Sequence, residues 1–242
     1  MKSIFISIII PGFNEEKRIQ KTLHTLFSYC VQRFTQFEII FVDDGSTDNT
    51  LHIVKKISSK MQQVQYLGYP DNKGKGYAIR FGFKHAKGTY VFFTDADLPY
   101  TPNFFSLAVE TFEKSSYDII SGNRHLMQSR NDAGLSQQRI WASRIFSFLV
   151  YSIFDIQRTD TQCGIKGFRN ACAKKIVHKS HINGYAFDVE LFILATQCQW
   201  QVGFLPVVLV NNQMSKIRLG FDSFYILKDI FKIYSRFKTS QK

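Results

Sequence analysis

The first half of the chain alternates short strand-like segments with segments of helical spacing, and this alternation constrains the fold more than any other feature. The strand-like segments lie at residues 3–10, 37–42, 64–67, 90–94 and 118–121. Between them, the pattern predicts helices at residues 15–29, 48–61, 74–86 and 102–114. Apolar strands that alternate with helices predict an α/β fold, with a mostly parallel central sheet flanked by helices.

The second half is less regular. Residues 160–169 form a polar, glycine-containing segment, whereas residues 187–199 and 221–237 have helical spacing and residues 202–210 resemble a strand. No internal repeat or low-complexity linker interrupts the chain. We therefore expect one domain over residues 1–215, followed by a C-terminal amphipathic helix within residues 216–242.

Net charge and cysteine usage limit the partners and the compartment. The chain has 31 basic and 19 acidic residues, and the resulting charge of +12 favours nucleic acid, an anionic membrane surface or phosphorylated substrates. Its four cysteines form no CxxC pair, which argues against a zinc site, and no secretory signal is evident, so we expect reduced thiols in the cytoplasm. No stretch reaches the roughly 20 apolar residues of a membrane-spanning helix, so any membrane contact is expected to be peripheral.

Two aspartates follow the predicted strand at residues 90–94. In open α/β sheets, ligands bind beyond the carboxyl ends of the strands, where Asp95 and Asp97 lie. Residues two apart in an extended segment point the same way, so both carboxylates can face one pocket. Their mutual repulsion favours a bound cation, and Mg²⁺ or Mn²⁺ prefers such oxygen ligands. A surface turn with two solvated aspartates is the alternative.

Two further motifs lie at the ends of predicted elements. Asp43, Asp44 and Ser46 follow the second strand, and their oxygens suit a base or ribose hydroxyls, although helix capping is an equal alternative. Lys75 lies in a glycine- and lysine-rich segment that opens a helix, an arrangement that suits a phosphate. A basic, solvated helix start is the competing interpretation, and the segment is not a Walker motif.

Charged residues in the second half could contact further phosphates. Arg124 follows a strand and can pair bidentately with phosphate. Lys166 and Arg169 add basic groups to the polar segment, and Asp188 begins a helix. Helix caps and surface ion pairs would explain the same residues.

The C-terminal helix carries a basic stripe. Lys228, Lys232 and Arg236 recur every four residues, beside aromatic residues that include Phe231 and Tyr234. A basic, aromatic amphipathic helix can lie in a membrane interface. Packing of the aromatic face on the core is the alternative.

The order of these motifs resembles that of the family 2 glycosyltransferases with the GT-A fold. The matching segments are residues 10–16, 42–48, 72–76 and 94–97. Residues 160–166, 186–191 and 215–216 look like the branch of dolichyl-phosphate β-glucosyltransferases. With them, the resemblance spans nearly the whole chain.

This resemblance implies an activity and assigns roles to residues. It implies an inverting, metal-dependent transfer of glucose from UDP-glucose to a polyprenyl phosphate, at the cytoplasmic face of a membrane. The implied donor-binding residues are Pro11, Phe13, Asn14, Glu15, Asp43, Asp44, Ser46, Lys75, Asp95 and Ala96. The implied metal ligands are Asp95 and Asp97, with Mg²⁺ or Mn²⁺ as the cofactor. The acceptor-phosphate candidates are Arg124, Lys166, Arg169 and Lys216, and the catalytic candidates are Asp95, Asp97, Arg124 and Asp188.

Two other functions fit parts of the sequence. A family 2 enzyme with a hydroxyl acceptor would need a base, for which Asp188 is the candidate, but the QxxRW motif of many such enzymes is absent. The sequence also departs from some relatives at Pro99, where they place a glutamine that binds the metal. A nucleic-acid-binding module would fit the positive charge, but no recognised nucleic-acid-binding signature is present.

Overall fold

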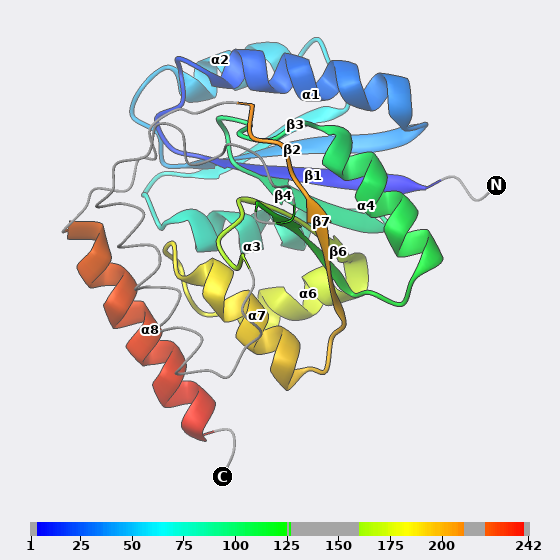
Figure 1. Cartoon of the computed structure of the whole chain (residues 1–242). Coiled ribbons are helices and arrows are strands. Elements are labelled where there is room, and N and C mark those ends of the chain that lie inside the picture. The colour runs from blue at the N-terminus through cyan, green and yellow to red at the C-terminus, as the bar shows by residue number, and fades with distance from the viewer. Residues whose placement is uncertain (1–3, 125, 127–159, 211–220, 240–242) are drawn as a thin grey trace.

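The computed structural model describes residues 4–124, 126, 160–210 and 221–239. In this part of the chain, seven strands form one sheet in the order β3-β2-β1-β4-β6-β5-β7 (Figure 1). The strands are β1 (Phe5–Gly12), β2 (Gln36–Asp44), β3 (Val64–Tyr69), β4 (Tyr90–Thr94), β5 (Ile119–Asn123), β6 (Ile165–Arg169) and β7 (Val202–Pro206). Strand β6 runs antiparallel to β4 and β5, and the other neighbouring strands pair in parallel.

Helices cover both faces of the sheet (Figure 1). The helices are α1 (Ile19–Arg33), α2 (Thr50–Ser58), α3 (Lys75–His85), α4 (Asn103–Lys114), α6 (Asn170–Lys179), α7 (Phe187–Gln197) and α8 (Phe221–Thr239). Side chains from α1, α2 and α4 join one buried cluster, and side chains from α3, α6, α7 and α8 join another. The alternating strand residues Ile8 and Ile9 of β1 divide between these clusters, because successive side chains point to opposite faces.

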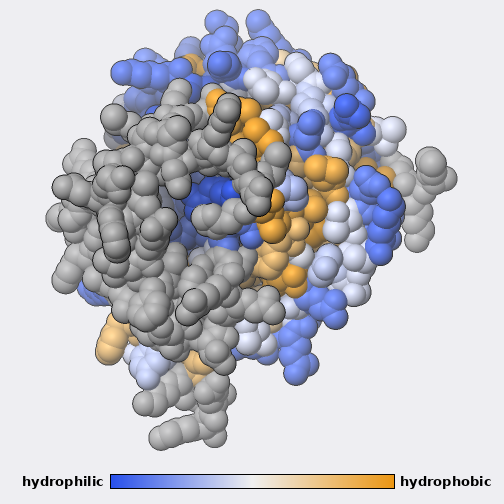
Figure 2. Space-filling model, viewed as in Figure 1, coloured by the Kyte–Doolittle hydropathy of each residue, from blue (hydrophilic) through white to orange (hydrophobic). Residues whose placement is uncertain are grey.

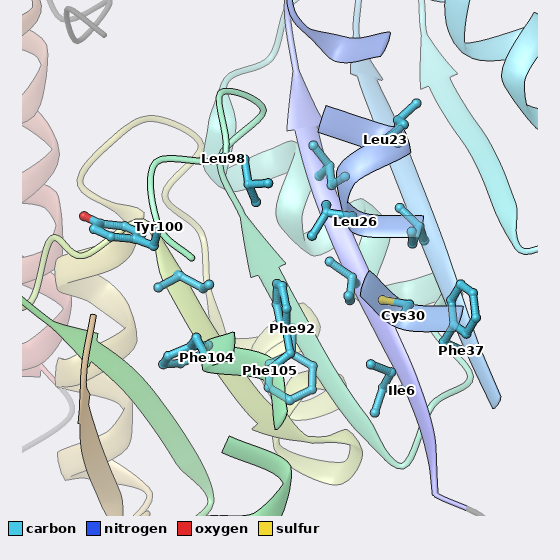
Figure 3. Close-up of a cluster of buried hydrophobic side chains, with 14 of the residues drawn as sticks. Ile6, Leu23, Leu26, Cys30, Phe37, Phe92, Leu98, Tyr100, Phe104 and Phe105 are labelled. Atoms are coloured by element: carbon cyan, nitrogen blue, oxygen red, sulfur yellow. The ribbon is translucent and has the colours of Figure 1, made fainter. Parts of the chain in front are cut away.

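The core under α1 and α4 is rich in aromatic residues. Figure 3 shows Leu23 and Leu26 of α1 on one side of this cluster, with Phe92 of β4 facing Phe104 and Phe105 of α4. The ring of Phe92 lies 5.4 Å from that of Phe105, in an edge-to-face arrangement that aromatic pairs prefer. The surface that faces the viewer in Figure 1 mixes polar regions with an apolar band across the region of α4 and β7 (Figure 2).

The structure confirms the predicted α/β class and the mostly parallel sheet. Two elements were not predicted from the sequence, strand β6 and helix α6. Strand β6 lies within the segment that is interpreted from the sequence only as polar and glycine-containing. Its first four residues are buried, and the strand lies inside the sheet between β4 and β5. The expected strand at residues 202–210 is shorter in the structure and ends at Pro206.

Helix α8 packs on the domain through one side only. Ile230 and Ile233 are buried in the cluster that also contains residues of α3 and α7, while Phe231 is 69 % exposed. The side chains of Phe224 and Leu227, expected on the aromatic face, lie outside the described residues. No helix in the described part of the chain combines the length and the apolar character needed to cross a bilayer.

Candidate active site

One edge of the sheet collects the carboxyl ends of neighbouring parallel strands. Strands β1, β2 and β4 are adjacent and parallel, so Asp43 at the end of β2 and Asp95 after β4 lie at the same edge. Strand β6 runs the opposite way, and Ile165 at its start pairs with Thr94 at the end of β4. The segment before β6 therefore reaches the same edge, where ligands bind in open α/β sheets.

The turn at Asp95 and Asp97 is fixed by its backbone. Leu98 has a left-handed conformation with φ of 45°, and its amide donates to the carbonyl oxygen of Asp95 at 3.0 Å. The hydroxyl of Thr22 in α1 donates to the carbonyl oxygen of Ala96 at 2.7 Å. These contacts hold the loop that carries both carboxylates, and they give Ala96 a structural role beside its predicted contact with the donor.

Gly164 lies against the first of these carboxylates. A β-carbon added to Gly164 would lie 1.9 Å from Oδ2 of Asp95, so no larger residue fits while Asp95 keeps this orientation. The close approach follows from the antiparallel direction of β6, which begins one residue later. Gly164 thus gives the Asp95 carboxylate the space that it occupies.

Basic groups surround the two aspartates. Nζ of Lys75 lies 2.8 Å from Oδ1 of Asp95, and a guanidinium nitrogen of Arg18 lies 3.9 Å from Oδ2 of Asp97. Arg18 also pairs with Glu15, with 2.7 Å between Nε and Oε2. Burial and the neighbouring charge of Asp95 raise the pKa of Asp97, despite the opposing effect of Arg18. Asp97 therefore ionises less readily than an ordinary aspartate when no cation is bound.

These residues suit a divalent cation bound together with a diphosphate. A cation between Asp95 and Asp97 would relieve the repulsion that raises the pKa of Asp97, and carboxylate and phosphate oxygens are preferred ligands of Mg²⁺ and Mn²⁺. Within the described residues, no group of three or more acidic, histidine or cysteine side chains could hold a metal without further ligands. The donor's phosphate oxygens would complete the shell.

A buried chain of charges extends behind Lys75. Asp188, at the start of α7, has Oδ1 at 2.6 Å from Nζ of Lys166 and Oδ2 at 3.5 Å from Nζ of Lys75. Burial raises the pKa of Asp188, but the two ammonium groups more than offset this and leave the pKa lowered. Burial likewise lowers the pKa of Lys75, and the charges of Asp95 and Asp188 reverse this and raise it. Asp188 and Lys75 therefore both stay ionised near neutral pH.

The predicted nucleoside-binding residues lie on two loops that hold each other. The amide of Asn14 donates to Oγ of Ser46 at 2.9 Å, and Asn14 adopts a φ of 54°. Oδ1 of Asp43 accepts from the amide of Ser46, whereas the buried Asp44 carboxylate accepts from the amides of Lys73 and Gly74. These contacts pre-organise the edge of β1 and β2.

Pro11, Phe13 and Glu15 belong to the same edge. Pro11 is buried within β1, Phe13 beyond it is 38 % exposed, and the amide of Glu15 donates to the Thr50 hydroxyl at 2.7 Å. Donor contacts of all these residues remain predictions.

Arg124 is held by a carboxylate that precedes β6. Its Nε and one terminal nitrogen each lie 2.7 Å from an oxygen of Asp160, and its backbone amide donates to the same group. Burial raises the pKa of Asp160, but the Arg124 guanidinium reverses this and lowers it. The Arg124 side chain remains 37 % exposed, so it stays a candidate for the acceptor phosphate in a fixed orientation.

The structure corrects two of the four acceptor-phosphate predictions. Arg169 pairs with Tyr90 at the start of β4, which is the opposite edge from Asp95. Its guanidinium donates to the carbonyl oxygens of Phe112, Ser115 and Tyr117, so it closes the far end of the sheet.

Lys166 is the second correction, because its side chain is fully buried and its ammonium binds protein groups. Besides the carboxylate of Asp188, its ammonium reaches the carbonyl oxygen of Cys163 at 2.7 Å. Lys216 lies outside the described residues.

Sequence reasoning missed two residues of the site. Arg18 has a possible signal, because it follows Glu15 by three residues at the start of the first helix, where side chains three apart can meet. Gly164 has a weaker signal, since a glycine near a charged motif can mark a close approach of backbone to another group.

Comparison with known proteins identifies relatives of this chain and of its fold. The sequence model described as glycosyl transferase family 2 matches residues 7–177. A dolichyl-phosphate beta-glucosyltransferase of Saccharomyces cerevisiae is 34 % identical over 249 residues, covering 95 % of this chain and 74 % of the relative. The protein of the same name from Drosophila melanogaster is 30 % identical, covering 97 % of this chain and 76 % of its own.

A solved structure shows the same architecture. Glucosyl-3-phosphoglycerate synthase from Mycobacterium tuberculosis, in complex with Mn²⁺, uridine-diphosphate-glucose and phosphoglyceric acid, superposes with a TM-score of 0.71 at 16 % identity. The match covers 96 % of this chain and 80 % of that one. Together with the matched sequence model, these findings show that the chain belongs to glycosyl transferase family 2 and has the GT-A fold.

Proposed function

We propose that the protein transfers glucose from UDP-glucose to a polyprenyl phosphate such as dolichyl phosphate, with inversion at the anomeric carbon. The observation that carries the proposal is the meeting of Asp95 and Lys75 at the carboxyl edge of the sheet, 2.8 Å apart. Two carboxylates that can hold a cation, with an ammonium group beside them, suit a nucleotide diphosphate. The names of the relatives support glucose as the sugar and a lipid phosphate as the acceptor.

The site favours an acceptor that is already anionic. Asp188 is the candidate base for a hydroxyl acceptor, but two lysines hold its carboxylate and lower its pKa, which makes it a poor proton acceptor. A phosphate acceptor attacks without losing a proton, so it needs alignment rather than a base. Arg124, fixed by Asp160, could align it.

The departing diphosphate needs positive charge beside it. Asp95 and Asp97 would hold a divalent cation, which stabilises the negative charge that develops on the departing diphosphate. Lys75 lies beside Asp95 and adds a fixed ammonium at the same place. Thr22 and the turn at Leu98 keep the two aspartates in position, so little reorganisation is needed during transfer.

The proposal is tested with a panel of donors and acceptors. We expect purified protein with Mn²⁺ to move radiolabelled glucose from UDP-glucose into a lipid extract containing dolichyl or undecaprenyl phosphate. GDP-mannose should give little product, and the free polyprenol should not replace the phosphate. Transfer to a sugar hydroxyl in place of the lipid phosphate would contradict the proposed acceptor.

We also propose that α8 places the enzyme on the cytoplasmic face of a membrane. The consecutive exposed positions of the helix surface are Phe231, Ser235, Lys228, Lys232 and Arg236, while Ile230 and Ile233 pack inward. An exposed aromatic ring beside a row of basic residues is the pattern of an interfacial helix. All four cysteines are free, which agrees with a reducing compartment.

Reversing three exposed basic residues of α8 should release the protein from anionic membranes. Each basic residue near such a surface contributes about 1 kcal/mol, so replacing Lys228, Lys232 and Arg236 by Glu should lower binding about 100-fold or more. Co-sedimentation with phosphatidylserine vesicles measures this. The matched control reverses Lys55, Lys56 and Lys60, which are exposed on or next to α2 at the other face of the sheet. Equal binding by both triple variants would reject the interfacial helix.

A further inference from the structure

We propose that Asp188, locked by the buried ammonium of Lys166, is a positioning residue that holds Lys75 at the diphosphate of the donor. The inference rests on the proposed function and deepens it, because it assigns the donor contact to Lys75 and gives Asp188 a role other than that of a base. It is carried by the geometry of four charged groups from four separate segments of the chain.

The pair of Lys166 and Asp188 is costly to bury, and its direct contact is supported by a further hydrogen bond from Lys166. Lys166 has no exposed side-chain surface, and its Nζ lies 2.6 Å from Oδ1 of Asp188 and 2.7 Å from the carbonyl oxygen of Cys163. Removing an ammonium and a carboxylate from water costs several kcal/mol each, and apolar residues often replace such pairs without loss of stability. A role in placing a third group explains why this pair is present.

That third group is Lys75. The second oxygen of Asp188 lies 3.5 Å from Nζ of Lys75, which in turn lies 2.8 Å from Oδ1 of Asp95. One oxygen of Asp188 thus contacts Lys166, which is buried in the core. The other contacts Lys75, whose side chain is 16 % exposed at the site. Lys75 therefore joins Asp188 to Asp95, one of the two carboxylates proposed to hold the cation.

Two glycines permit this contact between α3 and the start of α7. A β-carbon on Gly74 would lie 2.5 Å from the carbonyl oxygen of Asn183, and one on Gly76 would lie 2.4 Å from that of Ile182. The backbone at the start of α3 therefore packs directly on the segment that leads into α7. This close packing brings Lys75 within reach of Asp188.

The arrangement predicts that Asp188 affects donor binding only through Lys75. Without Asp188, Lys75 keeps only Asp95 as an anionic anchor and loses its fixed position. Hydrogen bonds to charged groups contribute enough that Lys75→Met and Asp188→Asn should each weaken UDP binding about 10- to 100-fold. The double variant should bind UDP no more than about twofold worse than Lys75→Met alone, because the two changes remove the same interaction.

Isothermal titration of UDP in the presence of Mn²⁺ measures these affinities. Lys84→Met is the matched control, because Lys84 is exposed in the last turn of the same helix, and it should leave the affinity unchanged. Asp188→Asn leaves Lys166 buried without its partner, so a second variant, Lys166→Met with Asp188→Asn, removes both charges together. It should show the UDP affinity of Lys75→Met.

Several outcomes would overturn the inference. If Asp188→Asn or the charge-free double variant binds UDP like the wild type and loses only kcat, then Asp188 acts as a base. Additive losses in the Lys75 and Asp188 double variant would show that Asp188 acts independently of Lys75. A wild-type protein that does not bind UDP with Mn²⁺ would instead reject the proposed function.

Discussion

Replacing Asp97 by alanine is expected to lower the kcat of glucose transfer by about 1000-fold, because groups that stabilise developing negative charge contribute on this scale. Asp97 is one of the two carboxylates that would hold the cation at the donor's diphosphate. The same variant should lose the part of UDP affinity that depends on Mn²⁺. A transfer assay and a UDP titration with and without Mn²⁺ measure both effects, and wild-type turnover would refute the assignment of Asp97.

Loss of the Asp97 charge should not lower the stability of the fold. Burial and the charge of Asp95 raise the pKa of Asp97 above its unfolded value, so the folded protein binds this proton more tightly than the unfolded chain. Stability from this group is therefore fully present below the unfolded pKa and is lost as the pH rises through the folded pKa. Asp97→Asn should melt at the wild-type temperature or slightly above it without metal.

Mn²⁺ provides the control for this effect. It should raise the melting temperature of the wild type and leave that of Asp97→Asn unchanged, because binding to the folded state alone stabilises it. A metal-free Asp97→Asn that melts several degrees below the wild type would show that Asp97 supports the fold.

Replacing Gly164 by alanine is expected to lower kcat/KM about 100-fold, since a displacement of about 1 Å in a site can have an effect of that size. The new β-carbon would lie 1.9 Å from Oδ2 of Asp95, so this carboxylate must rotate away from its present position. The clash falls on the end of a side chain and spares the backbone, so stability should change little. Mn²⁺-dependent UDP binding should weaken in parallel.

Gly184→Ala is the matched control for this substitution. Among the described residues, its β-carbon would meet only Oδ2 of Asp229 at 3.2 Å, which a small movement relieves. We expect normal UDP binding and turnover in Gly184→Ala. Unchanged Mn²⁺-dependent binding in Gly164→Ala would show that the position of Asp95 does not matter for the metal.

The parallel part of the sheet could be predicted because its pattern is local. The continuous apolar runs of β1, β2 and β4 need no knowledge of distant partners, and the rule for carboxyl edges then places Asp43 and Asp95 together. The positions of Lys75 and Asp97 follow from the same local signals.

Strand β6 could not be predicted because its stability depends on distant residues. It contains the buried Lys166, which is acceptable only because Asp188 lies 22 residues further along the chain. It also contains Gly167, where a β-carbon would lie 2.4 Å from the ring of Phe92. Neither requirement is visible in the segment itself, and both are contrary to ordinary strand preferences.

Missing this strand also led to the errors in the site. Without the antiparallel direction of β6, Lys166 and Arg169 were expected near the phosphates as part of one basic segment. The structure places Arg169 at the opposite edge and Lys166 inside the core. Arg18 was missed for a related reason, because its proximity to Asp97 arises from the packing of α1 beside the end of β4.

Removal of the divalent metal tests the central claim most directly. Wild-type protein is treated with EDTA, and transfer from UDP-glucose to dolichyl phosphate is then measured before and after Mn²⁺ or Mg²⁺ is added back. We predict that transfer stops on chelation and returns with the cation, while the melting curve shows that the protein stays folded throughout. Undiminished transfer by fully chelated, folded protein would contradict a metal held by Asp95 and Asp97.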